Sequence, residues 1–265
     1  MSAYTGLYSG AKKSGLLNTR FGRWLFTSSY DAYKRHIEDP FHALIAKRPY
    51  LFQGGHAIDV GANIGYTSSL FARAIDPGFR VYAFEPDETN FGYLKERAER
   101  RENGGRIVPV RCAVGCTDGK IALWRNEHHH GDHRILTDQL REAGVLLEAE
   151  ADWVPVTTID TFVRGAGPLG PVSFIKIDVQ GYEFPVCQGM EKTLSDNPGA
   201  IVALEFMPTA MLELGFDSDE MLAWWKSKGY AVSALSRSGD IRPGVPSSLG
   251  KSGYVDLLFS LKSIA

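Results

Sequence analysis

The sequence predicts an α/β fold in which a mostly parallel β-sheet is covered by helices. Short apolar runs alternate with longer amphipathic stretches along most of the chain, and glycine-rich turns separate them. The last two apolar runs have only a loop between them, so we expect them to form an antiparallel hairpin. The chain has 265 residues and a hydrophobic content of 44%, which is enough to bury one sizeable core.

The N-terminal segment is expected to be a helical extension of this fold. Residues 1 to about 22 are rich in Gly, Ser and Lys and have no sustained apolar period. From Trp24 to Phe52, apolar residues recur at helical spacing, with an interruption near Pro40. We therefore divide the chain into an extension over 1–52 and a main domain over 53–265.

Strands and helices alternate through the main domain. The expected strands are residues 56–60, 80–84, 107–114, 121–124, 154–156, 172–177, 200–204, 230–235 and 254–261. The expected helices are residues 66–74, 89–101, 183–194 and 221–228. We interpret the polar stretch over 128–151 as an insertion near the functional face, with a helical part over 136–147.

A glycine-rich loop with the sequence Asp59-Val-Gly-Ala-Asn-Ile-Gly65 follows the first strand and precedes the first helix of this domain. Such a loop brings its backbone and the free N–H groups of the helix close to a ligand. Glu85 ends the next strand, 85 − 65 = 20 residues after the last loop glycine, where an acid accepts hydrogen bonds from a ribose. These two motifs also fit a nicotinamide-dependent oxidoreductase, or a plain glycine turn with Glu85 as a surface charge.

Further motifs make the chain similar to the FkbM-type S-adenosylmethionine-dependent methyltransferase family. They are Phe174-Ile-Lys-Ile-Asp-Val-Gln-Gly-Tyr-Glu183, Pro155-Val-Thr-Thr-Ile-Asp160, Ile201-Val-Ala-Leu-Glu205 and Tyr254-Val-Asp-Leu-Leu-Phe259. The resemblance runs from about Ala57 to Glu205. It implies a Rossmann-like methyltransferase sheet of about seven strands, mostly parallel, with the antiparallel hairpin at one edge, and it makes 53–265 the methyltransferase domain.

The same resemblance implies a set of residues that bind the cofactor, S-adenosylmethionine. They are Asp59, Gly61, Asn63, Gly65, Tyr66, Thr67, Glu85, Cys112, Ala113 and Asp178. Cys112 and Ala113 follow the third strand, where the adenine is usually held. Arg111-Cys112 departs from the polar or acidic residue often found there, which weakens the adenine assignment.

Asp178, His133 and Glu205 are the candidate catalytic residues. Asp178 ends a strand at the open edge of the sheet, where it could act as a base, hold the amino group of the cofactor or help to bind a divalent metal. Gln180 stands where the family commonly has Glu, which weakens a metal site there, and we assign no metal ligand. Glu205 fits an acceptor contact and a structural cap equally well.

His133 belongs to the cluster His128-His129-His130-Gly131-Asp132-His133 in the polar insertion. Three roles fit this cluster: a solvated loop, a general base that accepts the acceptor's proton, and ligands of a divalent metal that orients hydroxyl groups.

The resemblance implies O-methylation of a hydroxyl on a small molecule, a glycan, a sugar or a secondary metabolite. A catalytically silent module that binds the nucleoside is a further alternative, with Gln180 as its argument.

A net charge of −2 gives no broad positive field for nucleic acid. The three cysteines form no CxxC pair, and we find neither a signal peptide nor a transmembrane segment, so we expect a soluble cytoplasmic protein. The aromatic residues Trp24, Phe26, Tyr30 and Tyr33 fit packing of the extension, a lid, a membrane surface or a homo-oligomer contact.

Overall fold

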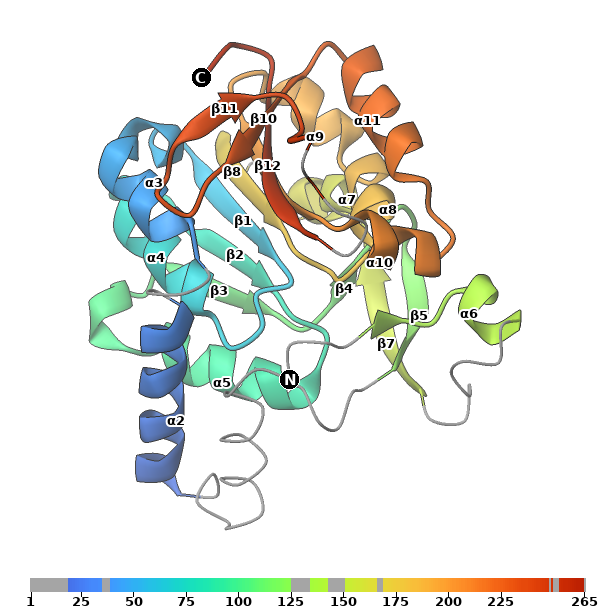
Figure 1. Ribbon diagram of the computed structural model, residues 1–265. Helices are drawn as coiled ribbons and strands as arrows, with labels where there is room; N and C mark the ends of the chain where they lie inside the picture. Colours follow the sequence, from blue (N-terminus) through green and yellow to red (C-terminus); the bar gives the residue numbers. More distant parts are fainter. Residues whose placement is uncertain are drawn as a thin grey trace.

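The computed structural model in Figure 1 describes residues 19–34, 39–124, 134–142, 151–165, 169–247, 249 and 253–264. At its centre is an eight-stranded sheet. In spatial order its strands are β11 (Ile241–Pro243), β10 (Ala231–Leu235), β12 (Val255–Ser260), β9 (Ile201–Phe206), β8 (Val172–Ile177), β1 (His56–Val60), β2 (Val81–Phe84) and β3 (Ile107–Val110). The predicted α/β class is confirmed.

The five strands from β9 to β3 are parallel to one another, and β12 is antiparallel to both of its neighbours. The predicted C-terminal antiparallel pair is therefore confirmed as β10 with β12. Eight strands are present where about seven were expected, because the three-residue β11 adds to β10 at the edge. Its sequence, Ile-Arg-Pro, is too short to show the alternating pattern of a strand, and its last residue is a proline, which cannot donate a hydrogen bond to a neighbouring strand.

Helices cover both faces of the sheet (Figure 1). One face carries α3 (Phe41–Lys47), the 3-10 helix η3 (Pro49–Phe52), α4 (Tyr66–Ala74), α5 (Glu88–Ala98) and, after it, η4 (Arg101–Asn103). The other carries α7 (Ile159–Gly165), α8 (Glu183–Gln188), α9 (Glu191–Asp196), α10 (Pro208–Glu213) and α11 (Ser218–Ser227). Successive side chains of β1 point to opposite faces of the sheet and so pack in two different hydrophobic cores. Ala57 packs in the core on the first face, and Ile58 and Val60 pack in the core on the second.

Two predicted elements are interrupted in the structure. The strand expected over 107–114 ends at Val110, and Ala113–Val114 forms β4 in a different sheet. The helix expected over 183–194 breaks into α8 and α9 at Gly189, where a Cβ atom would lie 2.0 Å from the carbonyl oxygen of Gly115. This close approach of two backbones excludes a side chain and stops the helix. The helices α7 and α10 were not predicted.

A second, four-stranded sheet borders the expected insertion over 128–151 and includes β6 from within it. Its strands are β4 (Ala113–Val114), β7 (Ala151–Thr157), β5 (Gly119–Trp124) and β6 (Arg134–Ile135), and α6 (Asp138–Glu142) follows β6. Figure 1 shows the sheet below α10. Its small core contains Leu123, Ile135 and Val154. Residues 143–150, which include the rest of the helix expected over 136–147, lie outside the described residues.

The helix α2 (Arg20–Tyr33) is tied to the main domain by arginines at the end of α5. The guanidinium group of Arg97 is 2% exposed and donates two hydrogen bonds to Asp31, at 2.7 and 2.8 Å, and a third to the carbonyl oxygen of Ile64 at 2.7 Å. Arg100 donates to Thr27 of the same helix. Among the described segments, no helix has the length and apolar character that crossing a membrane requires.

Replacing Asp31 with Ala should lower the free energy of unfolding by about 3 kcal/mol, because the buried Arg97 guanidinium loses its carboxylate partner. Urea denaturation would measure this. The matched control is Asp196→Ala, which breaks the exposed ion pair with Lys192 and should have no measurable effect. Equal stabilities of the two variants would contradict the structural importance of the Arg97 contact.

Candidate active site

A cavity of about 430 Å³ opens where the parallel strands β1, β2, β8 and β9 end. This is the edge at which open α/β sheets bind ligands. The predicted site residues that line it are Gly61, Asn63, Tyr66, Thr67, Glu85, Cys112, Ala113, Asp178 and Glu205. Two others, Asp59 and Gly65, are not part of its wall. His133 and the rest of the cluster over 128–133 lie outside the described residues.

The loop after β1 is shaped by a close contact with the end of β8. Gly61 has a φ of +75°, and a Cβ atom there would lie 1.9 Å from the carbonyl oxygen of Asp178. Asn63 also adopts a positive φ, of 50°, which is rare for a residue with a side chain. Gly65, at +81°, is the N-cap of α4. The loop therefore needs glycine where the two backbones meet.

The carboxylate of Glu85 binds the backbone of this loop. Its Oε2 accepts a hydrogen bond from the backbone N–H of Asn63 at 2.8 Å, and its Oε1 accepts one from Asp87 at 2.9 Å. Burial, together with the nearby Asp87 charge, raises the pKa of Glu85 to about 8 against these hydrogen bonds. The side chain of Asn63 lines the cavity, and its buried Oδ1 has no hydrogen-bond partner among the described residues.

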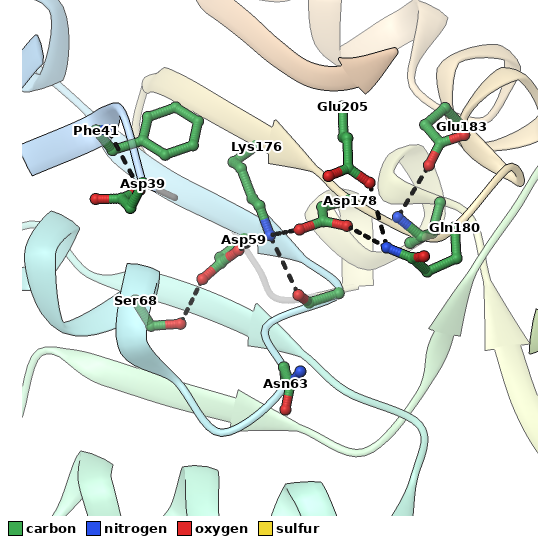
Figure 2. Close-up of polar contacts among 12 residues, drawn as sticks. Asp39, Phe41, Asp59, Asn63, Ser68, Lys176, Asp178, Gln180, Glu183 and Glu205 are labelled. Carbon is green, nitrogen blue, oxygen red and sulfur yellow. Dashed lines mark hydrogen bonds and ion pairs between the residues drawn. The ribbon is translucent and has the colours of Figure 1, made fainter. Parts of the chain in front are cut away.

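Lys176 lies buried between the two strand ends and holds them together (Figure 2). Its Nζ is 3.2 Å from Asp178 Oδ2 and 3.5 Å from Asp59 Oδ1, and it donates to the carbonyl oxygen of Gly61 at 3.2 Å. Asp59 in turn accepts a hydrogen bond from Ser68 at 2.6 Å. Burial opposes the ammonium charge, but the two carboxylates outweigh it and raise the pKa of Lys176.

Asp178 and Glu205 are brought together by Gln180, whose Nε2 donates to Asp178 Oδ1 at 3.1 Å and to Glu205 Oε2 at 3.2 Å (Figure 2). Burial disfavours the charge on Asp178, but the positive charge of Lys176, together with the other charges and hydrogen bonds around the carboxylate, outweighs burial, and the pKa of Asp178 is lowered. The pKa of Glu205 is raised by burial, followed by the charges of Asp178 and Asp256. Two neighbouring carboxyl groups thus have pKa values on opposite sides of their ordinary range.

Sequence reasoning missed several residues of this site. Lys176 was treated only as part of an apolar strand, although a lysine within such a run indicates a buried partner. Asp256 lies directly opposite Glu205 in the pairing of β12 with β9, and burial raises its pKa to about 7. The helix α2 and the residue after it supply Tyr30, Tyr33 and Lys34 to the cavity wall. No three His, Cys, Asp or Glu side chains in the described ranges are arranged to hold a metal ion.

The far end of the cavity is lined by the second sheet. Cys112 and Ala113 meet Leu123 and Ile135 there. Burial raises the pKa of the Cys112 thiol to about 11, so it stays protonated, and its Sγ donates to the carbonyl oxygen of Pro155. This end of the cavity therefore offers a largely apolar surface around Cys112 and Ala113, and the charged Arg134 of β6 also lines it.

The family model named Methyltransferase FkbM domain matches residues 59–232, about two thirds of the chain. The chain belongs to the FkbM methyltransferase family. In this family member the matched region includes the glycine-rich loop after β1, Glu85, Lys176, Asp178 and Glu205, and it ends within β10.

Two curated relatives of this FkbM-family chain also carry methyltransferase names. Hexuronic acid methyltransferase AglP from Haloferax volcanii is 26% identical over 147 residues, which cover 55% of this chain and 54% of that protein. Methyltransferase 1 from Beauveria bassiana is 25% identical over 145 residues, covering 51% and 57%. The chain thus spans about half the length of these relatives. A crystal structure of Methyltransferase FkbM from Methylobacillus flagellatus aligns with 98% of this chain and 55% of its own, at 20% identity and a TM-score of 0.49.

Substituting Lys176 with Met should lower the free energy of unfolding by about 3 to 5 kcal/mol at pH 7.5, since two buried carboxylates lose their cation. The pKa of Asp178, now lowered, should rise in the variant. Its folded state then gains stability by taking up a proton, so the deficit should shrink as the pH falls towards 5. Chemical denaturation at both pH values would test this, with the exposed Lys226→Met as the control. A deficit that is constant with pH would contradict the proposed charge balance.

Proposed function

We propose that this methyltransferase uses S-adenosylmethionine to methylate a hydroxyl group of a sugar, a glycan or a secondary metabolite. The observation that carries the proposal is one cavity with two chemically different ends. An apolar wall and the acid Glu85 lie on one side, and the linked carboxyl groups of Asp178 and Glu205 lie on the other. A nucleoside fits the first end, and a hydroxylated acceptor fits the second.

The residues present suit S-adenosylmethionine in four respects. Glu85 has lone pairs left on both oxygens for the hydroxyl groups of a ribose, beyond its two backbone donors. The buried Oδ1 of Asn63 lacks a donor that a bound nucleoside would provide. The largely apolar surface at Cys112 and Ala113 suits the faces of an adenine. Asp178, held ionised by Lys176, suits the positively charged amino group of the cofactor's methionine part.

When bound, this cofactor supplies a methyl group on a positively charged sulfur. What the chain itself must contribute is alignment of the acceptor oxygen and removal of its proton. Carboxyl groups at the acceptor side are suited to both tasks, because they accept hydrogen bonds from hydroxyl groups and can take up a proton. The acidic wall also favours the positive charge that the sulfur carries before transfer.

The acceptor class is supported by chemistry and by one relative. Tyr30, Tyr33 and Tyr254 line the cavity together with Gln180 and Glu205. Aromatic faces beside carboxyl and amide groups are suited to rings that bear several hydroxyl groups. The relative from Haloferax volcanii is named for methylation of a hexuronic acid, which is a sugar acid.

The two other functions considered from the sequence remain distinguishable. A nicotinamide-dependent oxidoreductase would use a similar loop and ribose acid, but the family match over 59–232 favours methyl transfer. A silent nucleoside-binding module would keep the cofactor end and lack turnover. Titration with both cofactors, followed by a transfer assay, separates the three.

Glu85 should control cofactor affinity. We expect calorimetry to show that Glu85→Gln weakens S-adenosylhomocysteine binding by about tenfold or more, because an ionised acceptor of the ribose hydroxyl groups is lost. Since the pKa of Glu85 is about 8, wild-type affinity should rise relative to the variant between pH 6.5 and pH 8.5 as the carboxylate forms. Glu88→Gln makes the same charge change at an exposed position and serves as the control. Unchanged affinity in Glu85→Gln would refute the ribose assignment.

Methyl transfer should be detectable directly. With S-adenosylmethionine and a panel of glycosides, uronic acids and hydroxylated metabolites, we expect S-adenosylhomocysteine to accumulate and one acceptor to gain a methyl group by mass spectrometry. The deoxy analogue of that acceptor, which lacks the methylated hydroxyl, should give no product. Tight S-adenosylhomocysteine binding without transfer to any acceptor would favour the silent module instead, and binding of a nicotinamide cofactor alone would favour the oxidoreductase.

A further inference from the structure

Gln180 adopts a strained backbone conformation, and this conformation determines where its side chain points. Its φ is +57°, in the left-handed region that residues with side chains rarely occupy. Strain of this kind persists where the surrounding structure enforces it, and it is concentrated at functional sites. Here it directs the side chain into the gap between Asp178 at the end of β8 and Glu205 on β9 (Figure 2).

The amide of Gln180 is chemically matched to this gap. Its Nε2 carries two hydrogen atoms, and the two hydrogen bonds it donates go to two different carboxyl groups. A glutamate has the same shape and has no N–H group. At this position it would place a third carboxyl group against Asp178 and Glu205.

The surroundings of the two carboxyl groups differ sharply. Asp178 has the ammonium group of Lys176 at 3.2 Å. Glu205 is instead acted on by the charges of three acids: Asp178 directly after β8, Asp256 on β12 and Glu183 at the start of α8.

The ammonium group of Lys34, at the end of α2, opposes these acids at Glu205. Asp39, which precedes α3, adds its negative charge at Asp256. Burial, followed by the charges of Asp178, Asp256 and Glu183, raises the pKa of Glu205 against the opposing charge of Lys34. Lys176 lowers the pKa of Asp178.

We propose that Glu205 accepts the proton of the acceptor hydroxyl during methyl transfer, and that Gln180 is the positioning residue that holds Glu205 beside Asp178. The inference rests on the proposed function. It goes further by assigning different tasks to the two carboxyl groups: Asp178 stays charged beside Lys176, and Glu205 takes up and releases the proton.

The reaction step balances with these groups alone. The acceptor oxygen forms a bond to the methyl carbon as the bond from that carbon to sulfur breaks, and the electron pair of the broken bond stays on the sulfur. The hydroxyl proton passes to the carboxylate of Glu205, which later returns it to water. A carboxyl group with a raised pKa is a stronger base than Asp178, whose charge Lys176 stabilises.

The decisive variant is Gln180→Glu, assayed for its pH profile with the acceptor found in the transfer panel. Because Glu205 must be ionised to accept a proton, the wild-type rate should rise with pH through the pKa of Glu205. The added carboxyl group should raise that pKa further and move the rising limb upward by about one pH unit. The rate should then be about tenfold lower on the acidic side and recover at high pH.

The control is Gln188→Glu, which adds the same charge at an exposed position on α8. It should leave the profile unchanged. Glu205→Gln should abolish the rising limb and lower the rate by about 100-fold or more. In all three variants S-adenosylhomocysteine should still bind, as calorimetry would show.

An NMR titration tests the same arrangement without an acceptor. In protein labelled with carbon-13 at the glutamate carboxyl carbons, the resonance that disappears in Glu205→Gln belongs to Glu205. It should titrate well above the ordinary range of glutamate, and higher still in Gln180→Glu but not in Gln188→Glu. An ordinary titration of Glu205, or a pH profile that Gln180→Glu does not shift, would overturn the inference. If the wild type did not bind S-adenosylhomocysteine, that would instead count against the proposed function. The NMR titration would still decide whether Gln180 and its neighbours raise the pKa of Glu205.

Discussion

The buried ammonium group of Lys176 is the interaction on which the site depends. Removing a charged amine from water is costly, and the cost is met here only because Asp59, Asp178 and the carbonyl oxygen of Gly61 surround it. These three partners belong to β1, to the end of β8 and to the loop between β1 and α4. One cation therefore fixes the position of the loop relative to the sheet and keeps the Asp178 carboxylate charged.

From this centre the electrostatic character of the cavity changes in both directions. Towards the second sheet it passes Glu85, a carboxyl group close to its titration point at neutral pH, and reaches the largely apolar surface around Cys112. Towards β12 it becomes acidic, with Glu205 and Asp256 facing each other across paired strands. Such a gradient is suited to a ligand pair in which one partner is cationic and the other carries hydroxyl groups.

Some of this organisation could be predicted from the sequence, because strong local patterns fixed it. The bounds of β1, α4 and β8 were predicted to the residue, and Glu85 and Asp178 share a cavity because neighbouring parallel strands end at one edge. Contacts between distant segments carry no such local signal. The partners of Lys176, the pairing that brings Asp256 to Glu205, and the parallel pairing of β4 with β7 all depend on tertiary packing.

The guanidinium group of Arg97 has a consequence for the evolution of the chain. It binds Asp31 in α2 and the carbonyl oxygen of Ile64 in the glycine-rich loop after β1 at the same time, although the family-matched region begins only at Asp59. A descendant that lost the helix before this region would keep an unneutralised cation directly beside this loop. Residues 31 and 97 are therefore expected to be inherited or replaced together. A change at either position should lower the stability of the loop conformation.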